Sequence, residues 1–141
     1  MSPLALLLVC AGATLAVEVG TRVHARLARR RLATLAGKHG FSPSDRGPTA
    51  TELMPHLGEA GIVGIASPRL RGALEREGRV VVRLDYIVGA TGSRRNRSRV
   101  LAVERLATGG WSPPEVGPFE LSLPEQYARL MARHDRAAAA S

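Results

Sequence analysis

The sequence predicts an α+β protein in which an N-terminal transmembrane helix continues into a basic juxtamembrane helix. A small antiparallel β-meander of three to four strands with short helices follows. Three observations predict this class: an almost uncharged N-terminal stretch of membrane length, a run of arginines directly after it, and an alternation of apolar and polar residues at 79–88. We expect the boundaries 1–23 for the transmembrane helix, 24–40 for the juxtamembrane helix, 41–135 for the small domain and 136–141 for a disordered tail.

Residues 4–23 are long enough to cross a bilayer as a helix. A span requires about 20 mainly apolar residues, and residues 3–17 carry no charge. The single acid of the stretch, Glu18, lies near its end, where a charge costs much less than at the bilayer centre. Arg22 follows four residues later, in the order that favours a helical ion pair.

Basic residues follow the apolar stretch and none precedes it. The basic residues of this collar are Arg22, Arg26, Arg29, Arg30, Arg31 and Lys38. Because basic residues stay in the cytoplasm, we expect a single-pass protein of the inner cell membrane with its N-terminus outside and its C-terminal domain in the cytoplasm. The alternative is a cleaved signal peptide with a cleavage site at residues 11–13, which the missing basic n-region disfavours.

Small residues recur at helical spacing within the apolar stretch. Gly12, Ala16 and Gly20 form the small-xxx-small pattern that lets two membrane helices approach closely, so this face could form a homo-oligomer. The alternative is that small residues are simply common in membrane spans. Cys10 is the only cysteine, which excludes an intrachain disulfide.

The net charge of +8 and the arginine-rich composition indicate an anionic partner. Arg22, Arg26, Arg29 and Arg30 share one helical face, so the juxtamembrane helix is either a lipid-headgroup contact or a solvated connection. The partners expected are the lipid bilayer and a membrane or cytosolic protein. Nucleic acid is the rival, and the membrane anchor makes it the weaker one.

Turn and cap residues divide the domain into its elements. Residues 42–48 are predicted to form a loop, and Thr49 or Thr51 can cap a short helix at about 51–60. Residues 69–75 and 79–88 form a hairpin around a three-residue turn at 76–78. A third strand at 99–106 would place Arg83 opposite Glu104 if the second turn is centred at 92–95.

The C-terminal part of the domain should add one edge strand and one helix. The edge strand is expected at 119–122. Ser122 then caps a final helix that has Pro124 in its first turn. Four residues at helical spacing should form the face of this helix that docks on the domain: Tyr127, Leu130, Met131 and His134.

Residues 82–99 and 117–125 resemble a loose group of uncharacterised bacterial single-pass membrane proteins. The shared features are a basic juxtamembrane helix that ends near Gly40-Phe41, an Asp-Tyr strand (Asp85-Tyr86), a basic glycine-containing hairpin loop (89–97) and a closing Pro-Phe-Glu-Leu segment (118–121). The chain departs from the group in having Leu84 where an aromatic residue usually precedes Asp-Tyr. The resemblance implies a fold and a location, and it implies no activity.

The sequence contains no recognisable catalytic constellation, so we expect a protein that is not an enzyme and that uses no cofactor or metal. The histidines stand singly, without the spacing of a metal site: His24, His39, His56 and His134. Residues 89–93 are rich in glycine, but they lie between strands and therefore offer no helix N-terminus for a phosphate group.

The hairpin loop is the exposed part of the domain whose side chains could bind another molecule. Arg94, Arg95, Arg97 and Arg99 cluster at its tip, where they could contact lipid headgroups, an acidic protein surface or RNA phosphates. The alternative is a solvated basic loop. The functional hypothesis is a membrane-anchored protein whose basic cytosolic domain binds a protein partner or the anionic membrane surface. The second hypothesis is a membrane-tethered nucleic-acid-binding protein that uses the same arginines.

Overall fold

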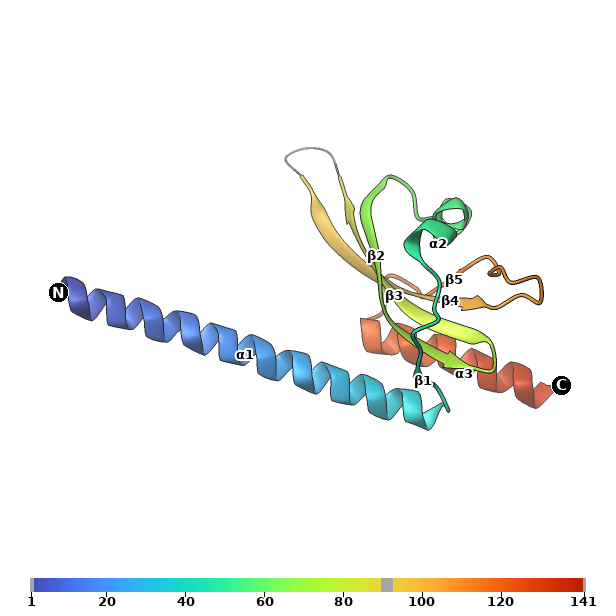
Figure 1. The fold of residues 1–141 in the computed structure, drawn as a ribbon, viewed down its shortest axis with the longest axis horizontal. Coiled ribbons are helices and arrows are strands. Elements are labelled where there is room, and N and C mark those ends of the chain that lie inside the picture. The colour runs from blue at the N-terminus through green and yellow to red at the C-terminus, as the bar shows by residue number, and fades with distance from the viewer. Residues whose placement is uncertain (1, 90–92, 141) are drawn as a thin grey trace. The chain divides into compact units, whose positions relative to one another are not determined.

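The computed structural model describes residues 2–89 and 93–140, with side chains as far as residue 132. The chain divides into two compact units, Met1–Thr34 and Leu35–Ser141. Helix α1 (Pro3–Lys38) runs through the first unit and ends in the second. The second unit contains a five-stranded antiparallel sheet and two further helices (Figure 1). The prediction of an α+β fold with an apolar N-terminal helix is confirmed.

The strands follow one another in the sheet in chain order, as a meander. They are β1 (Ser42–Pro43), β2 (Ile65–Arg76), β3 (Arg79–Val88), β4 (Arg95–Glu104) and β5 (Glu115–Val116), and the further helices are α2 (Ala50–Leu57) and α3 (Leu123–Ala140). The predicted loop at 42–48 was wrong at its start, because β1 pairs with the end of β2. The edge strand expected at 119–122 is β5 instead, and Phe119 is 67% exposed.

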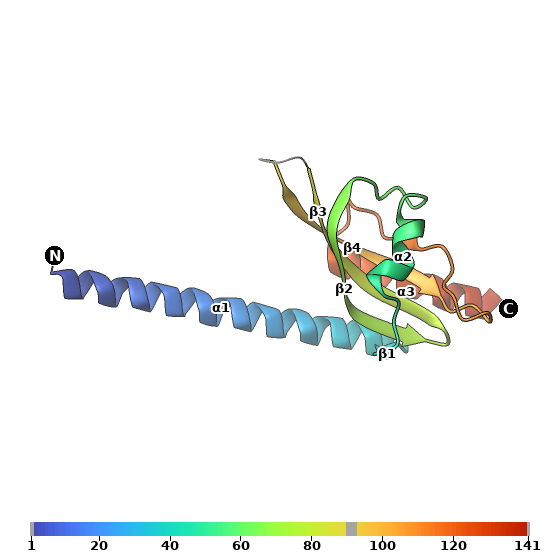
Figure 2. The ribbon, with the colours of Figure 1, turned by 45° about the horizontal axis from the view of Figure 1, so that its top comes forward.

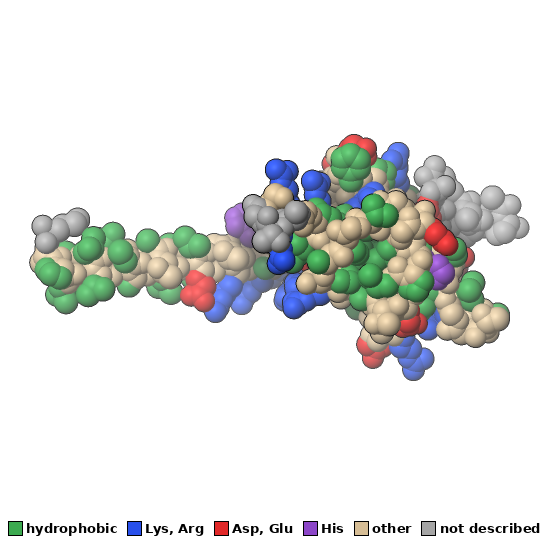
Figure 3. All heavy atoms as spheres, turned by 90° about the horizontal axis from the view of Figure 1, so that it is seen from above, with side chains coloured by type: hydrophobic (Ala, Val, Ile, Leu, Met, Phe, Trp, Pro, Cys, Tyr) green, Lys and Arg blue, Asp and Glu red, His purple; other side chains and the backbone are tan. Residues whose placement is uncertain are grey.

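Helix α1 is long and apolar enough, by length and composition, to cross a membrane. Its large apolar side chains from Leu4 to Val23 are exposed in the protein alone. Figure 3 shows apolar side chains along this helix, followed by an acidic one and then by basic ones. The predicted transmembrane and juxtamembrane parts are one continuous helix, so no structural break falls at residue 23.

Helix α1 ends at Lys38 in a glycine-based C-cap. Gly40 has a φ of +74°, and its N–H donates to the carbonyl of Gly37 at 3.2 Å. The N–H of Phe41 donates to the carbonyl of Ala36 at 2.8 Å. This is the Schellman arrangement, and both Phe41 and Ala36 are buried in the second unit. The cap therefore fixes the exit of the chain from α1 into β1.

Helix α2 is short and is held at both ends. Thr49, one of the two predicted caps, accepts a hydrogen bond from the N–H of Glu52, and the Glu52 carboxylate accepts one from the N–H of Thr49. This capping box contributes about 1 kcal/mol. At the other end the N–H of Ile62 donates to the carbonyl of Leu57 at 2.9 Å, and both residues are buried. Leu57 also belongs to the apolar cluster on the sheet, and this packing anchors α2.

The turn between β2 and β3 has two residues, not the three that were predicted. Glu77 and Gly78 both have positive φ, 51° and 84°, as a type I′ turn requires. Arg76 therefore belongs to β2 and pairs with Arg79. The two-residue turn matches the twist of the strands, which explains why the strands continue to its edges.

The register of β3 with β4 differs from the predicted one. Arg83 lies opposite Val100, and Glu104 lies opposite Arg79. The reason is that Val88 pairs with Arg95, so the connection between the strands is centred two residues earlier than predicted. Strand β4 also begins at Arg95 instead of residue 99, because its polar first half pairs with β3 despite lacking apolar residues. Residues 90–92 of the predicted hairpin loop lie outside the described residues.

Helices α2 and α3 cover opposite faces of the sheet (Figure 2). The face under α2 carries the main apolar cluster, in which Leu53 and Leu57 of α2 contact the predicted apolar face of β3. The buried sheet residues of this cluster are Val80, Val82, Leu84, Tyr86, Leu101 and Val103. The opposite face buries Val81, Val100 and Ala102 together with α3, of which Tyr127, Leu130 and Met131 are buried as predicted.

Arg79 connects α3 to the sheet and is only 8% exposed. Its Nη2 lies 3.0 Å from the Glu115 carboxylate and donates to the carbonyl of Leu130 at 3.1 Å. Its Nη1 lies 3.4 Å from Glu104. One guanidinium therefore joins β3, β4, β5 and α3. The backbone of residues 136–140, predicted to be disordered, continues α3.

Candidate anion-binding site

The exposed arginines that follow the β3–β4 connection are called the hairpin arginines here: Arg94, Arg95 and Arg97. None of them forms an ion pair with a described residue. Arg99, the fourth predicted tip residue, belongs to β4 and is half-buried. Its Nη2 donates to the carbonyl of Gly117 at 2.8 Å, so it fastens the segment after β5 and is not at the tip.

The predicted contact residues of α1 are all on the surface of the first unit. Arg22 lies 3.4 Å from Glu18, as the spacing predicted, and both side chains are more than half exposed. Such an exposed pair contributes little to stability. The rest of the arginine collar is exposed and makes no ion pair within the described part of the chain: Arg26, Arg29, Arg30 and Arg31. Gly12 and Ala16 are exposed, and Gly20 is partly exposed.

A hollow of about 450 Å³ lies on the α3 face of the sheet, at the end nearer the hairpin arginines. Strands β2, β3 and β4 supply its walls. The residues that line it are Ser67, Arg69, Arg71, Arg83, Asp85, Tyr86, Ile87, Asn96, Arg97 and Ser98. Four of these are arginines and one is an acid, so the hollow is strongly basic.

Two irregularities of β2 border its contribution to the hollow. The register with β3 shifts between Ala66 and Arg69 and again between Arg71 and Leu74. Ser67 has a φ of 51° at the first shift, and Gly72 has a φ of 60° at the second. Bulges of this kind bend a strand and change the direction of its side chains, and they are frequent beside functional sites.

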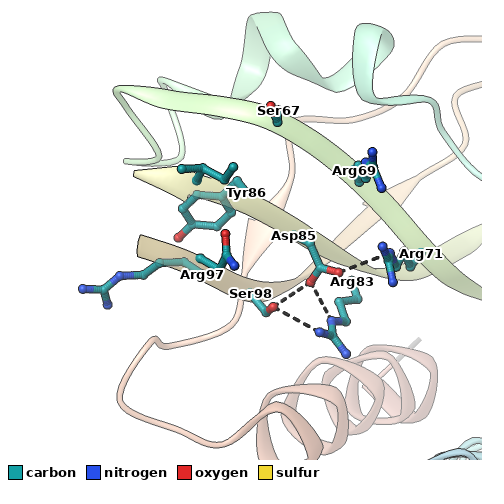
Figure 4. Close-up of a pocket in the computed structure, with 10 residues that line it drawn as sticks. Ser67, Arg69, Arg71, Arg83, Asp85, Tyr86, Arg97 and Ser98 are labelled. Carbon is teal, nitrogen blue, oxygen red and sulfur yellow. Dashed lines mark hydrogen bonds and ion pairs between the residues drawn. The ribbon is translucent and has the colours of Figure 1, made fainter. Parts of the chain in front are cut away.

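Asp85 is the centre of the polar contacts in the hollow (Figure 4). Its Oδ1 accepts hydrogen bonds from Nε of Arg83 at 2.7 Å and from the hydroxyl of Ser98 at 2.6 Å. Its Oδ2 lies 3.3 Å from Nε of Arg71. The Ser98 hydroxyl also accepts from Nη2 of Arg83 at 3.2 Å. Three strands thus converge on one carboxylate.

The Asp85 carboxylate is ionised at neutral pH. Burial raises its pKa, but the hydrogen bonds from Ser98 and Arg83 and the charges of Arg83 and Arg71 lower the pKa by more. The net result is a pKa below the ordinary aspartate value of 3.8. Asp85 therefore remains a negative charge between two arginines down to acidic pH.

The positive charge of the hollow exceeds what Asp85 neutralises. Arg71 and Arg83 lie directly opposite each other on β2 and β3, a cross-strand pairing of like charges that is unfavourable by itself. Arg69 lies opposite Asp85 but forms no ion pair with a described residue. A sheet that keeps three arginines around one carboxylate is suited to binding an anion.

Tyr127 of α3 has a raised pKa, and the charges of Asp85 and Arg83 in the hollow both influence it. Burial raises its pKa to about 12, with a smaller raising effect from the Asp85 charge and an opposing effect from the Arg83 charge. The folded-state pKa exceeds the unfolded value of 10.0, so the stabilisation is present below pH 10 and is lost as the pH rises from about 10 to about 12.

We expect one of the two tyrosines to ionise near pH 12. The absorbance of tyrosinate measured against pH on the folded protein tests this. The Tyr127→Phe variant should lack that step, and it should lose less stability between pH 10 and pH 12 than the unchanged chain. A step near pH 12 that persists in the variant would contradict the assignment to Tyr127.

The sequence interpretation singled out the hairpin arginines and did not find the hollow. The usable signal was the pair of i, i+2 spacings Arg69–Arg71 and Arg83–Asp85 on two strands joined by a turn. Residues two apart share one face of a strand, so antiparallel pairing brings these four side chains together. Without the register and the two bulges of β2, their proximity could not be derived.

The described residues contain no group of three or more His, Cys, Asp or Glu that could hold a metal ion. The fold and the site together define a small α+β protein with an apolar N-terminal helix and a basic hollow on its sheet. Comparison with protein-family models, curated proteins and solved structures finds no match to this chain.

Proposed function

We propose that this chain is a single-pass inner-membrane protein whose cytosolic domain binds the anionic surface of the bilayer through the hairpin arginines. The N-terminus lies outside, α1 spans the membrane, and the arginine collar stays on the cytoplasmic side. The observation that carries the proposal is that all three hairpin arginines are exposed without an acidic partner among the described residues. Their charge is therefore available to an external anion.

The anchor makes a lipid surface the nearest anionic partner. About 12 residues of helix, or roughly 18 Å, separate Val23 at the end of the apolar stretch from Leu35, where the second unit begins. Each arginine near an anionic leaflet contributes about 1 kcal/mol of binding. The hairpin arginines and the collar thus add many weak contacts to an anchor that already holds the chain at the bilayer.

The test uses residues 35–141, so that the apolar helix does not dominate binding. We expect the double variant Arg94→Gln, Arg95→Gln to bind phosphatidylglycerol vesicles about 30-fold more weakly, since about 2 kcal/mol is lost. Co-sedimentation with vesicles at several salt concentrations measures this, because screening should weaken binding of the unchanged fragment as well. Arg97 is left intact because it also borders the hollow.

The matched control is Arg46→Gln, Arg129→Gln, which removes the same charge from two other exposed positions. This control should change vesicle affinity much less than the hairpin variant. Equal losses in both variants would mean that only net charge matters, and unchanged binding in the hairpin variant would refute the proposal. A selective loss of affinity for single-stranded RNA would instead support the nucleic-acid alternative.

A further inference from the structure

We propose that the hollow between Arg69, Arg71 and Arg83 binds a phosphate monoester, carried either by a lipid headgroup or by a soluble phosphate ester. This inference goes beyond the proposed function. It uses arginines of β2 and β3 instead of the hairpin arginines, and it requires a discrete site instead of a general surface charge. The two proposals can therefore fail separately.

The charge of the hollow matches a doubly charged anion. Arg69, Arg71 and Arg83 supply three positive charges, and Asp85 is the only acid among the lining residues. The side chain of Arg97 points away from these three arginines (Figure 4), so the excess that they leave over Asp85 is +2. A phosphate monoester carries about −1.5 to −2 at neutral pH, whereas a phosphodiester carries −1. The balance favours the monoester, because it compensates the whole excess.

The donors of the hollow are arranged so that several stay available. Asp85 engages the Nε atoms of Arg71 and Arg83, and Ser98 accepts from Nη2 of Arg83. Both terminal nitrogens of Arg71 and Nη1 of Arg83 have no partner in the described part of the chain. A guanidinium donates in a fork that fits phosphate oxygens, and Asp85 holds two such forks in place.

The hollow also has the size and access that a phosphate ester needs. Its volume of about 450 Å³ falls in the range of small-molecule sites. The side chains of Arg71 and Arg83 are 60% and 41% exposed, so an anion can reach them from solvent. Ser67 and Asn96 line the hollow as well and supply neutral polar groups.

The test uses the full chain in dodecyl maltoside micelles and glycerol 3-phosphate as the probe. Isothermal titration should show saturable binding that Arg71→Gln and Arg83→Gln each weaken about tenfold, as expected for loss of a charge-assisted contact. The double variant Arg94→Gln, Arg95→Gln should leave this affinity within about twofold. If Arg83→Gln does not fold, as judged by circular dichroism, Arg71→Gln decides, because its side chain is the more exposed.

Asp85→Asn separates an organised site from mere attraction between charges. The substitution removes one negative charge from the hollow and replaces the carboxylate by a neutral amide, whose single oxygen is a weaker acceptor for the two Nε atoms. We expect weaker binding of glycerol 3-phosphate. Tighter binding in this variant would overturn the proposal, as would titrations that Arg71→Gln and Arg83→Gln leave unchanged or that the hairpin variant weakens equally.

Nanodiscs identify the source of the phosphate group once binding is established. In discs of phosphatidylcholine containing phosphatidic acid, a headgroup that fills the hollow should block glycerol 3-phosphate. If the probe still binds as it does in micelles, the soluble ester is the ligand. Discs with phosphatidylglycerol at the same total charge should not block the probe, and equal blocking by both lipids would refute selectivity for a monoester.

Discussion

A chain that carries Ala11→Arg and Leu15→Arg is expected to leave the membrane fraction almost completely. Both positions lie within about 4 Å of the middle of residues 4–23, at 1.5 Å of rise per residue. An arginine at the centre of a span costs about 2.5–3.5 kcal/mol on insertion scales, so the two together cost about 5–7 kcal/mol. No acid within residues 3–17 could compensate them.

Alkaline carbonate extraction followed by immunoblotting measures this effect, since carbonate removes proteins held only by surface charge. The control Ala11→Val, Leu15→Ile keeps the stretch apolar and should remain in the pellet. An intact mass of 15.0 kDa in that pellet would separate a retained helix from a cleaved signal peptide. Release of the unchanged chain by carbonate would contradict the proposed anchor.

Leu84→Ala is expected to destabilise the second unit by about 2–5 kcal/mol. Leu84 lies in the central strand β3, is 1% exposed and belongs to the apolar cluster with Leu53 and Leu101. Truncation removes three carbons from a packed interior and leaves a cavity. For a domain of about 100 residues this corresponds to a drop in Tm of at least about 8 °C.

Urea unfolding of residues 35–141, followed by Trp111 fluorescence, provides the measurement. Trp111 is the only tryptophan, and its Nε1 donates to Glu52 at 2.8 Å while Arg105 lies 4.7 Å above its ring. Its environment therefore depends on the folded unit. Leu106→Ala is the matched control, because Leu106 is 44% exposed and should cost less than about 0.5 kcal/mol. A loss below 1 kcal/mol for Leu84→Ala would contradict the described core.

The parts of the fold that depend on local patterns were predictable. Strand β3 has the predicted bounds, since five apolar residues at every second position define one buried face. Gly40 ends α1, and Ser122 precedes α3 as its cap, because caps use particular residues at particular positions. The length of α1 followed from an apolar stretch and from helix-forming residues after it.

The start of β4 could not be predicted in the same way. Residues 95–99 are arginines alternating with Asn96 and Ser98, a pattern that resembles a loop when it is considered alone. They form a strand because β3 offers them backbone hydrogen-bonding groups along its full length. Arg99, which was predicted at the hairpin tip, therefore lies within β4 and contacts the carbonyl of Gly117.

The sequence by itself determined an apolar N-terminal helix with a basic continuation, a hairpin whose turn contains Gly78, and an excess of positive charge. Each depends on residues that are close together in the chain. Only the tertiary structure decided that Arg69, Arg71 and Arg83 surround Asp85, because that arrangement needs the two bulges of β2 and one particular register between β2 and β3. Proximity across strands depends on the register of the paired backbones, and the two bulges change that register in a way that the local sequence pattern does not show.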